Sequence, residues 1–284
     1  MSDYTPLATI THDREGETMM VHKAEIQNNA MEMKKQSLHD LMKFVNPGTI
    51  IECGCGSGFV LEILSHHLKD SILLGIDKSF DRLLTLKQKN LCNVFPVQAD
   101  ITYIPCSRGS CTTALFVSSL HEVFSQVGET GVYRVLNMIH SLLADEGTLI
   151  IQDFLKPPPR QVELEFKRER ARKRFIRFAT EYRVRFIPYE ETPHGVKLDM
   201  GDVVEFFSKY WSPSRKDWEE EMDESHYFYT EKEFEKMAAD CSFAVVYTSL
   251  LPGSEEFVAA FSSEMHWDFS LPYRYIQLVL TPTL

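Results

Sequence analysis

The stretch Ile50-Ile51-Glu52-Cys53-Gly54-Cys55-Gly56-Ser57-Gly58 decides the fold that we expect for this chain. It begins as a short apolar run and ends in three alternating glycines, directly before a helical pattern at 59–68. Glycine is needed where the backbone turns sharply or approaches a ligand closely, and the start of a helix offers free N–H groups to an anion. The sequence therefore predicts a buried strand, a ligand-binding turn and a helix.

Short apolar strands alternate with helices along the next hundred residues. The patterns predict strands at 49–53, 72–76, 94–98, 114–117 and 148–152, and helices at 59–68, 80–89 and 129–143. A capping box at 230–233 begins another helix, and two last strands follow at 244–248 and 276–281. This alternation is typical of an α/β protein with a doubly wound, mostly parallel sheet.

Two segments lie outside the alternation. Residues 21–45 contain no Pro or Gly and have apolar residues at near-helical spacing, which predicts one or two N-terminal helices within a segment 1–46. Pro157-Pro158-Pro159 ends the fifth strand, and the charged and aromatic stretch that follows predicts an inserted lid or substrate segment at 157–229. The remaining residues, 47–156 and 230–284, are expected to form the main domain.

Two acids follow the next two predicted strands. Asp77 ends the second strand and suits the ribose hydroxyls of a nucleoside, and Asp100, after the third, suits an adenine amino group. A nicotinamide or flavin dinucleotide site is the rival interpretation, but its G-x-G-x-x-G pattern requires a third glycine where this chain has Phe59. Glu52 and Asp100 have no role in that pattern.

With these residues the chain resembles the class I S-adenosylmethionine-dependent methyltransferases, whose first motif, E-x-G-x-G-x-G, is matched by Glu52, Gly54, Gly56 and Gly58. The resemblance covers 47–154 and, in outline, 230–281, and it implies a Rossmann-like, seven-stranded sheet with a reversed last strand. It implies S-adenosylmethionine as the cofactor. Its expected contacts are Glu52, Cys53, Gly54, Gly56, Gly58, Asp77, Lys78, Asp100, Ile101, Ser118 and Ser119.

The tip of the fourth strand, Ser118 to Glu122, resembles the family segment that faces the methyl group and its acceptor. His121 is the candidate general base, because neutral imidazole can take a proton near neutral pH. A loop histidine bonded to the backbone is the alternative. Glu122 is a candidate for orienting that histidine or binding a cationic acceptor, and a solvated surface charge is the competing interpretation.

Composition narrows the class of protein. Hydrophobic residues make up 44% of the chain and charged residues 25%, and no apolar run or leader pattern indicates a membrane span or a secretory signal. The six cysteines include no C-x-x-C pair, and no histidine has metal-like spacing, so neither a zinc site nor disulfides are expected. A cytoplasmic enzyme without a bound metal is the resulting expectation.

The sequence constrains the identity of the methyl acceptor less than that of the methyl donor. A small molecule is the favoured acceptor, with 157–229 closing over the donor site. Within an acidic chain of net charge -11, residues 160–185 hold ten Lys or Arg against four Glu, so an RNA (or protein) methyltransferase that uses a basic helix there is the alternative. A packed amphipathic helix whose charges pair with Glu163, Glu165, Glu169 and the acidic run 219–224 is the other explanation of that segment. Aromatic residues that follow are candidates for lining an acceptor pocket, with a place in the core as the alternative: Trp211, Trp218, Tyr227 and Tyr229. A donor-binding protein without catalysis is the third possibility.

Overall fold

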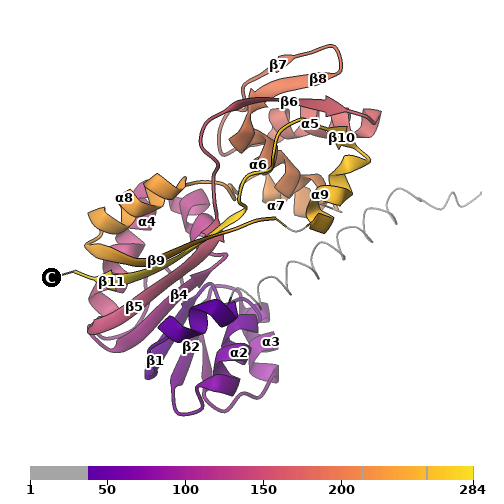
Figure 1. Cartoon of the computed structure of the whole chain (residues 1–284). Helices are drawn as coiled ribbons and strands as arrows, with labels where there is room; N and C mark the ends of the chain where they lie inside the picture. Colours follow the sequence, from indigo (N-terminus) through magenta and orange to yellow (C-terminus); the bar gives the residue numbers. More distant parts are fainter. Residues whose placement is uncertain (1–37, 213, 254, 284) are drawn as a thin grey trace, which may run out of the picture.

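The computed structural model describes residues 38–212, 214–253 and 255–283, which form a large α/β domain and a smaller cap (Figure 1). The α/β domain contains β1 (Thr49–Cys53), α2 (Phe59–His67), β2 (Ile72–Asp77), α3 (Phe80–Gln88), β3 (Val94–Gln98), β4 (Cys111–Val117), α4 (Leu120–Leu142), β5 (Leu143–Phe154), α8 (Glu231–Asp240), β9 (Phe243–Leu251) and β11 (Tyr275–Pro282). A short 3-10 helix, η1 (Met42–Phe44), precedes β1.

The seven strands of the α/β domain form one sheet in the order β3-β2-β1-β4-β5-β11-β9. The first five strands are parallel, and β11 is antiparallel to both of its neighbours, β5 and β9. The direction of strand succession reverses between β1 and β4, which in such sheets opens a crevice at the carboxyl edge. The predicted doubly wound, mostly parallel seven-stranded sheet with a reversed last strand is confirmed.

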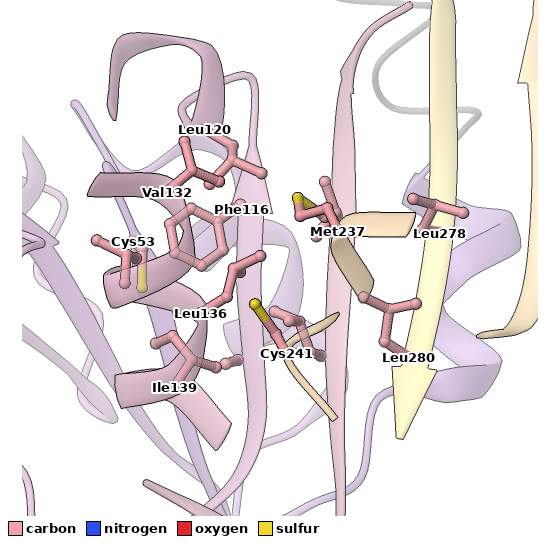
Figure 2. Packing of buried hydrophobic residues seen from close by; sticks show 14 of the residues in the cluster. Cys53, Phe116, Leu120, Val132, Leu136, Ile139, Met237, Cys241, Leu278 and Leu280 are labelled. Atoms are coloured by element: carbon pink, nitrogen blue, oxygen red, sulfur yellow. The ribbon is translucent and has the colours of Figure 1, made fainter. Parts of the chain in front are cut away.

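Helices cover both faces of this sheet because its central strands are apolar on both sides. Ile50 and Ile150 belong to the cluster that α2 and α3 complete, and the adjacent residues Ile51 and Ile151 belong to the cluster completed by α4 and α8. Figure 2 shows the second cluster, with Phe116 among the α4 side chains. The described end of the predicted N-terminal helical segment joins the first cluster through Leu38, Leu41 and Val45; residues 21–37 lie outside the described residues.

The cap has its own sheet and its own core. A four-stranded antiparallel sheet, in the order β10-β6-β8-β7, packs with four helices around an aromatic cluster. Its elements are β6 (Gln161–Phe166), α5 (Glu169–Glu181), β7 (Tyr189–Glu191), β8 (Gly195–Asp199), α6 (Met200–Tyr210), α7 (Arg215–Glu221), α9 (Glu255–Ser262) and β10 (Met265–His266). We use "cap" for residues 157–229 together with 252–274.

The second of these ranges corrects the predicted domain boundaries, which placed 252–274 in the main domain. Tyr275 pairs with both Phe154 and Leu251, so β5 and β9 end and β11 begins at the same edge of the sheet. The connection between β9 and β11 therefore passes over the carboxyl edge, where α9 and β10 join the cap sheet and core.

The predicted basic helix at 160–185 is also corrected. Its first part is strand β6, in which Val162 and Leu164 are buried and the intervening Glu163 is exposed, the two-residue period of a strand. Only 169–181 is helical. Among the described residues, no helix is both long and apolar enough to cross a membrane.

Candidate active site

A cavity of about 650 Å³ lies at the carboxyl edge of the sheet, within the range of ligand pockets. The ends of β1, β2 and β3 and the start of α4 form one wall, and α7 with the residues after it forms the other. Its lining residues are Gly54, Asp77, Lys78, Ser79, Arg82, Asp100, Ile101, Thr102, Glu122, Val123, Ser125, Gln126, Val127, Lys216, Glu220, Asp223 and Glu224.

The glycine loop requires glycine for two different reasons. Gly54 has φ +75°, and a Cβ there would lie 2.6 Å from Cβ of Ser119. Gly58, the N-cap of α2, also has φ +75°, and a Cβ there would meet Leu86 at 2.1 Å. Backbone N–H groups of Gly54 and Cys55 donate to the Ile76 carbonyl at 2.8 and 3.0 Å, which fixes the loop against β2. The loop is thus shaped before any ligand binds.

Asp77 organises this loop as well as lining the cavity. Its Oδ2 accepts from the Gly56 N–H at 2.8 Å and its Oδ1 from the Ser79 N–H at 2.8 Å. Each carboxylate oxygen has two lone pairs, so both retain capacity for a ligand hydroxyl. A side chain that is only 5% exposed therefore connects the loop, the start of α3 and the cavity.

Asp100 lies on the same cavity after β3. The hydroxyl and the backbone N–H of Thr102 donate to its Oδ1 at 2.7 and 2.8 Å, and these hydrogen bonds lower the pKa of Asp100. The carboxylate is ionised at neutral pH. Lys78 and Ile101, the neighbours of the two acids, also line the cavity as expected from the sequence.

The tip of β4 is held in an unusual backbone conformation. Ser118 has φ +56°, a region that residues other than glycine rarely adopt and that often marks a functional turn. The Ser119 hydroxyl donates to the Cys53 carbonyl at 2.6 Å, and the N–H groups of Leu120 and His121 donate to Asp153 Oδ2 at 2.8 and 3.1 Å. Asp153 therefore caps α4 and ties the tip of β4 to the end of β5.

The structure does not fit His121 as a general base. Its ring is 3% exposed, with Nδ1 2.6 Å from Asp153 Oδ1 and Nε2 2.9 Å from Glu224 Oε1. Burial opposes the charged ring, but the carboxylates of Asp153 and Glu224 outweigh it and raise the pKa of His121 to about 10. A histidine that is protonated at neutral pH and bonded at both nitrogens cannot accept a proton, and it does not line the cavity.

Glu122 does line the cavity, but a different acid contacts His121. Burial, together with the nearby Glu224 carboxylate, raises the pKa of Glu122. Glu224, from the cap, occupies the position beside the histidine that the sequence suggested for Glu122. The other expected contacts do not belong to the lining: these are Glu52, Cys53, Gly56, Gly58, Ser118 and Ser119, which lie behind it or beside it.

Sequence reasoning missed the cap side of this cavity. Lys216, Glu220, Asp223 and Glu224 approach it from α7 and the following turn. The acidic run 219–224 was visible in the sequence, but its only predicted role was to pair with the basic segment. Arg82 and Ser125 were equally undetected, although both lie one turn into helices that begin at predicted site positions.

The basic segment is extensively paired within the cap. Arg183 bonds Asp223 with both Nε and Nη2, Arg185 pairs with Asp202, and Arg174 lies over the ring of Trp218 at 4.9 Å. The apolar residues of its helix are core: Phe175 and Phe178 are fully buried. Of the four aromatic residues considered for an acceptor pocket, Trp211 and Trp218 belong to the cap core and Tyr229 to the core of the α/β domain. Tyr227 is also buried, but it lines a second cavity.

Comparisons with known proteins agree with this geometry. A family model described as a methyltransferase domain matches residues 51–151. No curated protein sequence matches the chain significantly. Similar solved structures include an S-adenosylmethionine-dependent methyltransferase from Mesorhizobium loti, with 14% identity over 87% of this chain and 96% of that one and a TM-score of 0.55.

Two further structures align over 99% of this chain. One is geranyl diphosphate C-methyltransferase from Streptomyces coelicolor, with 10% identity, 88% of its own chain covered and a TM-score of 0.54. The other is 1,6-didemethyltoxoflavin-N1-methyltransferase from Burkholderia thailandensis, with 13% identity, 94% of its own chain covered and a TM-score of 0.52. At these identities the likeness establishes the fold.

The cavity suits the cofactor that the domain match implies. A pre-shaped glycine loop closes one end, and two acids, Asp77 and Asp100, stand at successive strand ends for an adenosyl group. The cations Lys78 and Arg82 lie on the same lining and match a ligand carboxylate. The chain therefore contains an S-adenosylmethionine-dependent methyltransferase domain, matched over residues 51–151, on a Rossmann-like fold.

Proposed function

We propose that this enzyme methylates a small molecule with an apolar body and a negatively charged group. The observation that carries the proposal is a second cavity, of about 670 Å³, between the start of α4 and the cap. Ser125, Gln126 and Asp223 line both this cavity and the donor cavity. An acceptor held there adjoins the donor, and a space of this size suits a metabolite.

The lining of the second cavity indicates the chemistry of its ligand. Phe124, Tyr227 and Phe228 supply aromatic surface, and Lys156 supplies a cation. Within the described part of the chain, no carboxylate lies within ion-pair distance of Lys156, whereas the two arginines of the lining, Arg183 and Arg185, are already paired. Lys156 is therefore the group that we expect to hold a carboxylate or phosphate of the acceptor.

On the donor side we propose that Asp77 binds the ribose, that Asp100 approaches the adenine and that the Gly54 loop surrounds the amino acid part. The bound cofactor supplies an electrophilic methyl group on a sulfonium. The protein's contribution is alignment and exclusion of water, because holding two reactants in line supplies much of the rate in such a displacement. Asp223 of the cap lies on the lining of both cavities.

The similar structures support a small acceptor. The Streptomyces coelicolor enzyme contains geranyl diphosphate and the Burkholderia thailandensis enzyme contains 1,6-didemethyltoxoflavin. An RNA acceptor is less well supported, because Arg170, Arg177, Arg183 and Arg185 of the basic segment form ion pairs within the protein. These charges are partly neutralised and offer less attraction to phosphates.

Cofactor labelled on its methyl group, incubated with the enzyme and with separated metabolite, RNA and protein fractions, tests the proposal. We expect label in acidic metabolites. Once an acceptor is found, Lys156→Gln should raise its KM by about 10-fold to 100-fold, the loss of one charged hydrogen bond, while the exposed control Lys232→Gln should not. Label in RNA or protein, or no transfer with intact cofactor binding, contradicts the proposal.

A further inference from the structure

Two histidines and a glutamate converge where the cap meets the start of α4. His121 Nε2 lies 2.9 Å and His226 Nε2 lies 3.8 Å from Glu224 Oε1, and the three ligand atoms all fall within 4.8 Å of one another. His121 is buried, and the side chains of His226 and Glu224 are 13% and 27% exposed. Two imidazoles and one carboxylate are the ligand set of many catalytic zinc and non-haem iron sites.

Both histidines are oriented by a partner on the opposite ring nitrogen. Asp153 holds Nδ1 of His121 at 2.6 Å, and the Ser208 hydroxyl lies 2.9 Å from Nδ1 of His226. Because Ser208 donates its own hydrogen to the Glu205 carbonyl, its oxygen is available to accept from Nδ1–H of His226. Lys209 Nζ lies 3.2 Å from the same nitrogen, so in this tautomer its hydrogens turn to Glu205 and Glu221. Each Nε2 is thereby directed at Glu224, as in metal sites where an outer group fixes the ligating histidine.

The surrounding charge favours an added cation. Four carboxylates, those of Asp153, Glu205, Glu221 and Glu224, border the cluster, and Asp153 and Glu205 are fully buried. Lys209, also fully buried, lies 3.3 Å from Glu205, 3.0 Å from Glu221 and 3.2 Å from Nδ1 of His226, so one cation beside the cluster offsets part of this negative charge.

We propose that His121, Glu224 and His226 bind one divalent transition metal ion. Ligand atoms about 2.1 Å from a tetrahedral ion lie roughly 3.4 Å apart, so the two separations from Glu224, 2.9 and 3.8 Å, need to change by about half an ångström. The two histidine nitrogens lie within 4.8 Å of each other and approach further on binding. Glu224 lines the donor cavity, so the fourth position faces that space, where water completes the coordination. The site does not depend on the identity of the methyl acceptor.

Calorimetric titration of tag-free, chelator-treated protein with Zn²⁺ tests the proposal directly. We expect one equivalent to bind, with affinity at least about 100-fold weaker in His226→Asn and Glu224→Gln. Asp153→Asn, which removes the charge that positions His121 and replaces one hydrogen-bond acceptor by a donor, should bind about 10-fold more weakly. The matched controls His66→Asn and Glu235→Gln, both at exposed positions, should bind as the unmodified protein does. The far-UV circular dichroism spectrum of each variant verifies that it is folded.

A second measurement needs no variant. Co²⁺ bound at this site should give the visible spectrum of nitrogen and oxygen ligation, without the thiolate charge-transfer band that cysteine ligands produce. The proposal is overturned if the protein binds no stoichiometric metal, if the Co²⁺ spectrum shows thiolate ligation, or if the His226→Asn and Glu224→Gln variants bind Zn²⁺ as tightly as the controls. None of these outcomes depends on methyl transfer, so the proposed function stands or fails separately.

Discussion

The α/β domain and the cap are built on different physical principles. The core of the α/β domain is mainly aliphatic, and its donor edge is built by strands and helices that follow one another from β1 to α4. The cap core is rich in aromatic residues and gathers segments about 100 residues apart. Phe207 of α6 stacks on Phe261 of α9 with ring centroids 4.4 Å apart, although β9 and α8 separate them in the chain. The comparison teaches that the donor side of this enzyme is encoded locally and the acceptor side through long-range packing.

The three tryptophans make this contrast measurable. All of the tryptophans in the sequence, Trp211, Trp218 and Trp267, belong to the cap cluster or pack against it. Tryptophan fluorescence therefore reports on the cap, and far-UV circular dichroism on the whole chain. The two signals distinguish which region a substitution weakens.

The largest effect is expected from Phe178→Ala in the cap core. Phe178 is fully buried between Tyr182 and Phe206, with ring centroids at 5.1 and 5.5 Å, so truncation should lower the free energy of unfolding by about 3–5 kcal/mol. Guanidinium denaturation followed by fluorescence should show the shift. Phe116→Ala, equally buried in the sheet, is the matched control and should act mainly on the circular dichroism transition. An unmoved fluorescence transition in Phe178→Ala would contradict the account of the cap.

The same contrast explains what sequence could and could not predict. Gly54, Asp77 and Asp100 were predictable because each follows its own strand, and parallel strands end at one edge. Glu224 and His226 were not, because their place beside His121 depends on how the cap folds back. No local periodicity encodes a contact between residues 121 and 224.

The predicted boundaries of the cap were wrong for a similar reason. Strand β6 carries alternating glutamates that raise its polarity, and the basic residues beside it suggested one long helix. Residues 252–274 looked like a loop over the sheet, because long-range contacts assign them to the cap, namely the pairing of Met265 with Phe166 in β6 and the packing of Phe261 in the cap core. The course of these residues over the carboxyl edge of the sheet could not be predicted before the pairing register of β11 was known.

A smaller effect is expected at the glycine loop. Gly54→Ala imposes positive φ on alanine and a contact of 2.6 Å with Ser119, so it should destabilise the protein by about 2–3 kcal/mol. Gly109→Ala, also at positive φ (+65°) but with open space around its Cβ, isolates the backbone strain and should cost only about 1 kcal/mol. Chemical denaturation followed by circular dichroism compares the two. Equal losses would show that the close approach to Ser119 does not matter.

The smallest effect, and one that depends on pH, is expected at Glu264, which ties residues 252–274 to the rest of the cap. Its Oε2 accepts from Arg170 Nε at 2.7 Å and from the Tyr210 hydroxyl at 2.9 Å. Burial alone would raise the pKa of Glu264, but these hydrogen bonds outweigh it and lower the pKa below its usual value. The ionised form is therefore the one that stabilises the fold.

Because the folded pKa is depressed, this stabilisation is complete above the unfolded pKa of about 4.3 and is lost as the pH falls through the folded pKa. Glu264→Gln should cost about 1.5 kcal/mol at neutral pH, and the difference from the unmodified protein should close only in acid. Thermal unfolding measured by fluorescence from pH 7 downward tests this. A difference that stays constant into strong acid would mean that the ionised carboxylate is not the source of stability.

The central claim is that Gly54, Asp77 and Asp100 form a site for S-adenosylmethionine at the carboxyl edge of the sheet. Calorimetric titration with S-adenosylhomocysteine of the unmodified protein, of Asp77→Asn and of the exposed control Asp70→Asn tests it most directly. We predict one binding site, an affinity about 100-fold weaker in Asp77→Asn and no change in Asp70→Asn, since a lost charged hydrogen-bond pair is worth about 1.5–3 kcal/mol. No binding to the unmodified protein, or equal affinity in all three, would contradict it.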